Sequence, residues 1–166
     1  MPRRAAARLR ALAVSALLFG ALFGVAPPIL AQNIVLLNTR ALNFGRFAAA
    51  GGGHVTISPA GARSKSGSLI LMNSPTTSSA SFNVTKSKNG NTTQAIVISL
   101  PANNTIKLNS GVNNMAVNNF VASPATISTI PNNGNVVLTV GATLTVGPSQ
   151  MPGAYSGSFP VTVNYQ

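Results

Sequence analysis

The segment Pro152-Gly-Ala-Tyr-Ser-Gly-Ser-Phe-Pro-Val-Thr-Val-Asn-Tyr-Gln166 closes the sequence with a regular alternation of residue types. Aromatic, β-branched and glycine residues occupy every second position: Tyr155, Gly157, Phe159, Val161, Val163 and Tyr165. An alternation with a period of two predicts a half-buried β-strand whose apolar face packs against the core. Because Pro160 has no amide donor, we expect an edge or a bulge at that position.

The same segment resembles the C-terminal strand of chaperone–usher pilins, on the basis of Gly153, the alternation that follows it and the penultimate Tyr165. In those subunits a periplasmic chaperone holds the final strand, so the resemblance implies such a partner here. The other interpretation is the ordinary last strand of a secreted β-sandwich, because any half-buried strand alternates in this way. Neither interpretation describes an enzyme.

The composition excludes most catalytic chemistry. The chain contains no Asp, no Glu and no Cys, and its one histidine is His54. General acid–base catalysis by carboxylates, a Ser-His-Asp triad and thiolate chemistry are therefore ruled out. The carboxylates that Ca²⁺ and Mg²⁺ prefer are missing, and one histidine makes no zinc cluster. We expect no catalytic residue, no metal and no cofactor, and we interpret His54 as a surface residue.

Residues 1–31 have the features of a cleaved signal peptide. Basic residues precede an apolar stretch, Ala11 to Val25, which is short for a membrane span, and Ala31 then stands before Gln32. We therefore expect an exported protein, located in the periplasm, at the cell surface or outside the cell, with one domain over residues 32–166 and no transmembrane anchor after cleavage. A retained membrane anchor is the other interpretation of this segment.

The basic residues that follow residue 31 are scattered and form no run. They are Arg40, Arg46, Arg63, Lys65, Lys86, Lys88 and Lys107. Such a surface favours solubility first, and contact with an anionic surface second. No aromatic platform is interleaved with these residues, so we expect no specific binding to nucleic acid.

The rest of the chain consists of short apolar runs separated by turn residues, with no helical period. The clearest run alternates from Leu138 to Val146 and forms either one strand or two strands separated at Gly141. We interpret Ala48 to Gly53 as a small-residue turn and Asn89-Gly90 as a hairpin. The fold class is therefore all-β, with an immunoglobulin-like antiparallel β-sandwich of Greek-key topology as the expected architecture. Tyr155 is expected to bond a nearby backbone group through its hydroxyl, as a tyrosine corner does.

Several stretches resemble one bacterial secreted family, the domain of unknown function 4402. They are Leu-Asn-Phe-Gly-Arg-Phe (42–47), Gly-His-Val-Thr-Ile-Ser-Pro-Ala-Gly-Ala-Arg (53–63), Ala-Ser-Phe-Asn-Val-Thr (80–85), Leu-Thr-Val-Gly-Ala-Thr-Leu-Thr-Val (138–146) and the C-terminal residues 152–165. This family resembles the Mat, or common-pilus, type of fimbrillin. The resemblance implies an exported immunoglobulin-like domain in fimbria-like assemblies, and it supplies no catalytic residues.

Two classes of function follow. The first is a structural subunit, a pilin-like protein that pairs its strands with a periplasmic chaperone and with like subunits. In fimbriae an N-terminal extension is the donor strand; here Ile34 and Leu36 alternate suitably, whereas Asn38 and Arg40 interrupt the pattern. The second is a self-contained secreted module that binds a cell surface or a carbohydrate. The chain has no tryptophan, and the expected core face uses both tyrosines, which weakens a sugar-stacking site.

Overall fold

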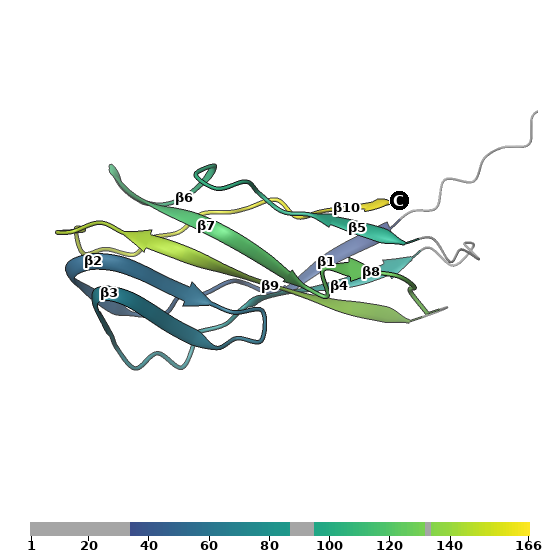
Figure 1. Cartoon of the computed structure of the whole chain (residues 1–166), viewed down its shortest axis with the longest axis horizontal. Coiled ribbons are helices and arrows are strands. Elements are labelled where there is room, and N and C mark those ends of the chain that lie inside the picture. The colour runs from purple at the N-terminus through teal and green to yellow at the C-terminus, as the bar shows by residue number, and fades with distance from the viewer. Residues whose placement is uncertain (1–33, 87–94, 132–133) are drawn as a thin grey trace, which may run out of the picture. The chain divides into compact units, whose positions relative to one another are not determined.

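The computed structural model describes residues 34–86, 95–131 and 134–166, all of which belong to one compact unit. The expected signal peptide (residues 1–31) and the expected hairpin at Asn89-Gly90 lie outside the described residues. Within the described ranges every regular element is a β-strand, and all strand pairs are antiparallel (Figure 1). The expected all-β, antiparallel class is confirmed.

The strands are β1 (Ile34–Arg40), β2 (Phe47–Ile57), β3 (Arg63–Leu71), β4 (Ala80–Lys86), β5 (Ile96–Ser99), β6 (Ile106–Ser110), β7 (Asn113–Ser123), β8 (Thr126–Ile127), β9 (Asn135–Val146) and β10 (Thr162–Tyr165). They form a 7-stranded sheet with the order β1-β4-β9-β2-β3, in which β7 joins β9 and β6 joins β7, and a 3-stranded sheet with the order β10-β5-β8.

Strand β9 organises the large sheet because it pairs along both of its edges. Thr139 and Val140 pair with β4 and with β7, whereas Thr143 and Leu144 pair with β2 and with β7. It follows that β4 and β2 share one edge of β9, one after the other, and that β7 covers the opposite edge.

The alternation predicted for residues 138–146 holds along one continuous strand. Its alternate residues are buried: Leu138, Val140, Ala142, Leu144 and Val146. At Gly141 a Cβ atom would lie 2.3 Å from the carbonyl oxygen of Ile57. The glycine therefore allows the end of β2 to approach the middle of β9, and it does not divide the strand.

Two apolar clusters hold the unit together. The cluster that we call the hairpin core surrounds the β2–β3 hairpin and consists of Phe44, Val55, Ile57, Leu69, Met115, Val117, Ala142, Leu144 and Val146. The cluster that we call the sandwich core lies between the two sheets and consists of Ala80, Phe82, Val84, Ile96, Ile127, Ile130, Leu138 and Val140. Because Ile96 and Ile127 come from the small sheet, the two sheets pack against each other in a β-sandwich-like arrangement.

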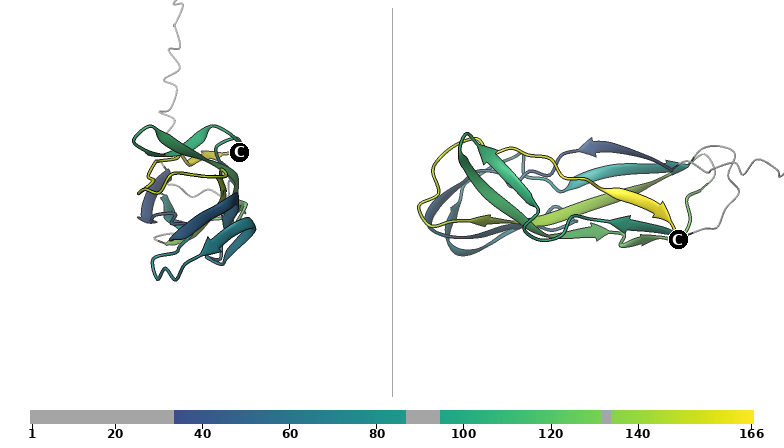
Figure 2. Two further views of the ribbon diagram at one scale, coloured as in Figure 1. Left: turned by 90° about the vertical axis from the view of Figure 1, so that its left-hand side faces the viewer. Right: turned by 90° about the horizontal axis from the view of Figure 1, so that it is seen from above.

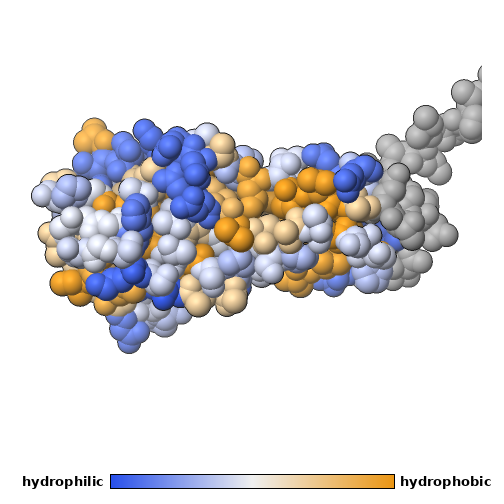
Figure 3. All heavy atoms as spheres, in the orientation of Figure 1, coloured by the Kyte–Doolittle hydropathy of each residue, from blue (hydrophilic) through white to orange (hydrophobic). Residues whose placement is uncertain are grey.

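Some apolar side chains stay on the surface around the small sheet. Val97 of β5, Val121 of β7 and Val137 of β9 are all exposed. Figure 3 shows apolar surface over the end of the molecule where β5 and β8 lie.

The small-residue turn expected at Ala48–Gly53 is wrong, because these residues belong to β2. The pairing of β2 with β3 changes register between Ala49 and Gly53, and Gly53 has a φ of 144°. A Cβ atom on Gly53 would lie 2.1 Å from the carbonyl oxygen of Ser66. Glycine adopts a positive φ without steric cost, and both a β-bulge and a turn use this property. The composition of the stretch therefore did not distinguish a bulge from a turn.

Candidate functional site

The C-terminal segment crosses both sheets and bonds to a different strand in each. Ser156 and Asn109 of β6 exchange two backbone hydrogen bonds, with N···O distances of 3.0 and 2.8 Å. Further on, β10 pairs with β5, and the amide of Gln166 donates to the carbonyl of Ala95 at 2.9 Å. Figure 2 shows this segment in yellow, running from the β6 end of the unit to β5.

Side chains along this segment alternate as the sequence predicts. Tyr155, Phe159, Val161, Val163 and Tyr165 are half-buried, and the residues between them are exposed. The side chains that pack on the sandwich core are Phe159, Val161, Val163 and Tyr165. The ring of Phe159 also packs at a tilt against Phe120, with 5.0 Å between ring centroids. The expectation of one strand from residue 155 to 165 was too long, since only Thr162–Tyr165 is regular.

Position 157 of the alternating segment holds a glycine because β6 leaves no room there for a side chain. A Cβ atom at this position would lie 2.6 Å from the carbonyl oxygen of Lys107 and 3.2 Å from the Leu108 side chain. The inward direction at residue 157 is therefore filled by β6. Gly153 is similarly confined, because its Cβ atom would lie 2.5 Å from the Ser110 hydroxyl.

Backbone direction along the segment can be derived from these bonds. In extended chain, successive residues direct their N–H and C=O groups to opposite edges. Ser156 bonds to β6 and Gln166 bonds toward β5, so the even-numbered residues face the paired side. The odd-numbered residues from Tyr155 to Val161 make no backbone hydrogen bond to any other described residue, and we call the side of the segment opposite β6 and β5 the free edge. Pro160 is even-numbered, so its missing donor does not interrupt the free edge.

A second stretch of chain, Asn38–Ala49, faces the free edge. Asn43 exchanges two backbone hydrogen bonds with Ser78, with N···O distances of 2.8 and 3.1 Å. Leu42 and Phe44 make no backbone hydrogen bond to any other described residue. Gly45, with a φ of 73°, donates from its amide to Oδ1 of Asn43 at 2.8 Å and turns the chain into β2.

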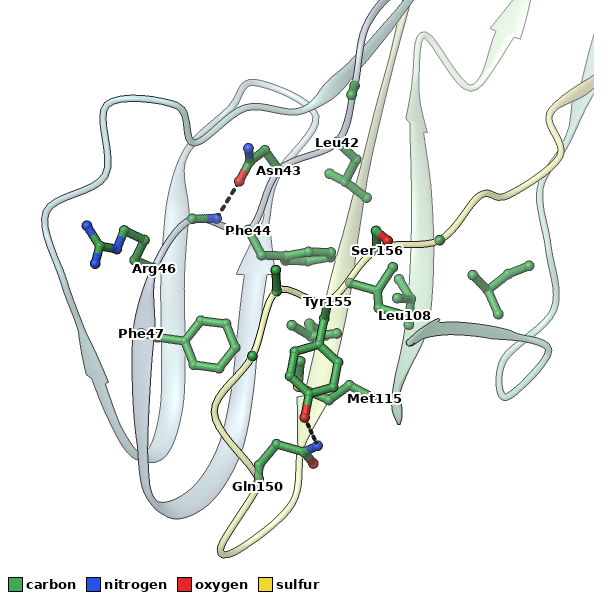
Figure 4. Close-up of a pocket in the computed structure, with 18 of the residues that line it drawn as sticks. Leu42, Asn43, Phe44, Arg46, Phe47, Leu108, Met115, Gln150, Tyr155 and Ser156 are labelled. Atoms are coloured by element: carbon green, nitrogen blue, oxygen red, sulfur yellow. Dashed lines mark hydrogen bonds between the residues drawn. The ribbon is translucent and has the colours of Figure 1, made fainter. Parts of the chain in front are cut away.

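Between these two stretches lies an apolar groove of about 1120 Å³. Leu108, Met115, Val117 and Leu144 line it from β6, β7 and β9, and Leu42 and Phe44 line it from the N-terminal side. Figure 4 shows the rings of Phe47 and Tyr155 at one end of the groove, with the side chain of Arg46 directed away from it. The sequence did not point to Leu42, Phe44 or Met115 as site residues; the short alternation of Leu42 and Phe44 before Gly45 was the available signal.

Tyr155 fixes the end of the groove through its hydroxyl group. The hydroxyl donates to the carbonyl of Met151 at 2.7 Å and accepts from Nε2 of Gln150 at 2.8 Å (Figure 4). Gln150 also reaches the carbonyl of Asn114 at 3.4 Å. The backbone bond predicted for Tyr155 from the sequence is confirmed by its bond to Met151. The contact of the loop with the start of β7 is made by Gln150.

The N-terminal candidates Ile34 and Leu36 lie in the chain's own large sheet. They pair with Lys86 and Val84 of β4 and pack on the sandwich core, as Val163 and Tyr165 do. The end of β1 is fastened by side chains, because Arg40 donates from Nε to the carbonyl of Ser79 at 3.0 Å and from Nη2 to its hydroxyl at 3.1 Å.

The stretches Ile34–Ala49 and Gln150–Tyr165 lie along the two sides of the groove and its continuation, and we call the region between them the seam. Its two walls run antiparallel to each other. Ile34 and Tyr165 both pack on the sandwich core, while Phe47 and Tyr155 both pack on the hairpin core. The structure thus brings Gly153, Tyr155, Gly157 and Phe159 together at the groove, and it places Val161, Val163 and Tyr165 farther along the same wall.

The remaining candidate features, within the part of the chain that the structure describes, are metal-ligating clusters, membrane-spanning helices and the one histidine. No group of three His, Cys, Asp or Glu residues is found in the ranges that the structure covers. Within those same ranges no helix has the length and apolarity to cross a membrane. His54 is exposed on β2, where its Nδ1 lies 3.3 Å from the Thr145 hydroxyl, and it does not line the groove.

These features define an all-β, β-sandwich-like domain with an apolar groove beside an unpaired backbone edge. Residues 34–165 match the family described as Domain of unknown function (DUF4402), and the chain belongs to that family. Comparison with curated proteins and with solved structures gave no match.

Proposed function

We propose that the chain is a non-enzymatic exported structural protein, a pilin-like subunit that acts by β-strand pairing along its seam. The observation that carries the proposal is the free edge beside the groove. The odd-numbered residues from Tyr155 to Tyr165 combine inward side chains with outward backbone groups, and the groove next to them is apolar.

An extended strand is the occupant that satisfies both features. Unpaired N–H and C=O groups at a sheet edge accept another strand by main-chain hydrogen bonding. Alternate side chains of that strand would enter the groove, where burial contributes about 25 cal/mol per Å² of apolar area. A compact ligand would fill the groove and leave the backbone groups to water.

The charges on edge strand β3 support this assignment. Strand β3, at the edge of the large sheet, carries Arg63 and Lys65. Cations on edge strands oppose unwanted pairing. The free edge from Tyr155 to Tyr165 has no charged side chain, which is what a surface kept for strand pairing requires.

The topology supports an immunoglobulin-like Greek key that lacks one strand. In this interpretation β1, β4, β9 and β7 belong to one sheet and β5 and β10 to the other, and β10 approaches β1 without pairing with it. The basic and apolar features of residues 1–31 support export. A periplasmic chaperone or a neighbouring subunit would supply the missing strand.

A second candidate is the self-contained secreted module. It is favoured by β1, because Ile34 and Leu36 already pair with β4 within the chain. In that case the N-terminal strand completes its own sheet and is not a donor.

The proposal is tested by amide hydrogen exchange of the exported protein, resolved by residue with NMR. In the free protein, the amides of Phe159, Val161 and Val163 should exchange fast, while those of Thr162 and Asn164 are protected. A synthetic peptide with the sequence of residues 32–40 should slow the three odd-numbered amides. If these amides are already protected without peptide, the seam is closed and the proposal is wrong.

Removal of residues 32–40 separates the two candidates. A pilin-like subunit should remain folded and lose any ladder of oligomers. A self-contained module, monomeric from the start, should instead unfold or lose much of its stability. Circular dichroism and light scattering measure both outcomes on the same sample.

A further inference from the structure

We infer that the open half of the β2–β3 hairpin is a flap that gates one end of the groove, hinged at glycines and latched by Arg63. The flap consists of residues 46–50 on the β2 side and residues 68–72 on the β3 side. The flap follows from the contacts of the hairpin alone, whereas its role as the gate for a strand rests on the proposed function.

The contacts of Arg63 show that the hairpin is folded back on itself. Strand β3 runs from Arg63 to Leu71, and a straight strand of this length would separate Arg63 from Met72 by roughly 30 Å. The Arg63 side chain nevertheless donates from Nη1 to the carbonyl of Met72 at 3.1 Å and from Nη2 to the carbonyl of Arg46 at 2.8 Å. The closed and open ends of the hairpin therefore lie against each other. Figure 1 shows the hairpin bending at the end of the unit opposite β5.

The bend lies at glycines on both strands. Gly53 of β2 pairs with Gly67 of β3, and Gly52, Gly53 and Gly67 have φ angles of 83°, 144° and 77°. A Cβ atom on Gly67 would lie 2.7 Å from the carbonyl oxygen of Gly52. Glycine alone permits both this close approach and the positive φ angles. Because no side chain stiffens the backbone at this point, we assign the hinge of the flap to these three residues.

The flap is held by few backbone contacts. Strand β9 pairs with β2 from Gly53 to Ile57 and not beyond, whereas Phe47 to Ala49 pair with Leu71 to Leu69 of β3. Strand β3 is the edge strand of the large sheet. Among the described residues the flap is therefore a two-stranded ribbon, and such a ribbon is marginally stable by itself. Its position depends on the contacts that its side chains and carbonyl groups make.

The flap forms one wall of the groove. Phe47, Ala49 and Met72 line the groove, and Phe47, Ala49 and Leu71 pack on the hairpin core. Figure 4 shows the ring of Phe47 beside that of Tyr155 at this end of the groove. A rotation of the flap about its hinge would move Phe47 away from Tyr155 and widen the groove for an incoming strand.

Arg63 is the latch because its two bonds reach backbone carbonyls on both strands of the flap. Lys65 adds a bond from Nζ to the carbonyl of Leu69. Hydrogen bonds from charged donors are stronger than neutral ones, so these bonds hold the flap in place. The Nε atom of Arg63 is buried and has no hydrogen-bond partner among the described residues. Opening the flap would return this donor to water, which makes the latch easier to release.

The test uses single cysteines as reporters of opening in the exported protein, because the chain has no cysteine of its own. Leu69 of the flap and Leu138 of the sandwich core are both 0% exposed. N-ethylmaleimide should label Leu69→Cys faster than Leu138→Cys, because opening of the flap uncovers the first thiol and only unfolding of the domain uncovers the second. Urea denaturation of each protein corrects the rates for any difference in global stability.

Removal of the latch should act on the flap reporter alone. Arg63→Gln should raise the labelling rate of Leu69→Cys about tenfold and change that of Leu138→Cys much less. Lys107→Gln removes the same charge from β6 and should leave both rates unchanged. Equal acceleration of both thiols by Arg63→Gln would show that Arg63 stabilises the whole domain, and it would overturn the inference. Labelling of the two reporters at the same corrected rate would overturn it as well.

Binding of a fluorescent peptide with the sequence of residues 32–40, followed by stopped flow, tests the role of the flap as a gate. Its association rate should rise in the Arg63→Gln protein in proportion to the labelling rate of Leu69→Cys. An unchanged association rate would overturn the gate. Failure of the peptide to bind either protein would overturn the proposed function and the gate with it, while the labelling rates still decide whether the flap opens.

Discussion

Ser156 and Asn109 exchange two backbone hydrogen bonds, and this pair determines which edge of the C-terminal segment is free. Because Ser156 faces β6, its neighbours Tyr155 and Gly157 direct their backbone groups the other way, toward the seam. If the segment were displaced by one residue, Pro160 would come to the free edge and interrupt it. The apolar side chains would also turn outward. The same register therefore buries the apolar face and leaves an uninterrupted edge.

The first prediction concerns the two faces of the C-terminal segment. Val161 is half-buried against the sandwich core and Thr162 is exposed. Val161→Asp should lower the free energy of unfolding by about 2 kcal/mol or more, because it places a carboxylate among apolar side chains. Thr162→Asp should change it by less than about 0.5 kcal/mol. Urea denaturation measures both, and equal losses would contradict the assigned faces.

The second prediction concerns Gly157. A side chain there would meet the carbonyl oxygen of Lys107, with a Cβ distance of 2.6 Å. We expect Gly157→Val to cost about 1–3 kcal/mol, because the segment must move away from β6 and lose its bonds to Asn109. Gly147→Ala is the matched control, since its Cβ would meet nothing closer than 3.5 Å. A stable Gly157→Val protein with intact exchange protection at Ser156 would refute the close approach.

The third prediction concerns Tyr155. Tyr155→Phe keeps the ring in the hairpin core and removes the hydroxyl that bonds Met151 and Gln150. We expect a loss of about 1 kcal/mol in the free energy of unfolding, because two polar partners lose a hydrogen bond. The amides of the loop 147–153 should exchange faster than in the parent protein. Unchanged exchange in that loop would show that the hydroxyl does not hold it.

The fourth prediction concerns acid. The chain has no Asp or Glu, so the side-chain carboxylates whose protonation causes most acid denaturation are missing. Burial lowers the pKa of Arg63. A lowered pKa of a guanidinium group changes the stability only at strongly alkaline pH, where stability is lost as the pH falls through the folded value, so Arg63 adds no slope at low pH.

Stability should therefore be nearly flat between about pH 3 and pH 6. The denaturation midpoint, followed across that range, tests this expectation, and His54→Ala serves as the control for the one histidine. A steep loss that persists in the His54→Ala protein would contradict it.

The alternation of apolar and polar residues within a single strand predicted which side chains of that strand face the core. The alternation from Tyr155 to Tyr165 identified which side chains face the core, because side chains of an extended chain alternate whatever the strand pairs with. The alternation from Leu138 to Val146 identified the central strand in the same way. The composition removed carboxylate and thiol chemistry, since a missing residue type is missing in every fold. The five stretches between residues 42 and 165 that resemble the domain of unknown function 4402 identified the family.

The parts that depend on a partner strand were decided by tertiary structure alone. The sequence of residues 155–165 does not specify which edge bonds to β6 and β5, because backbone groups alternate equally in either register. Gly52 and Gly53 allow a turn and a bulge alike, and only the approach of Ser66 makes the region a bulge. The groove forms where Leu42 and Phe44 meet a segment more than a hundred residues away in the chain. Such a contact depends on how the sheets close, and the local preferences of the two segments do not encode it.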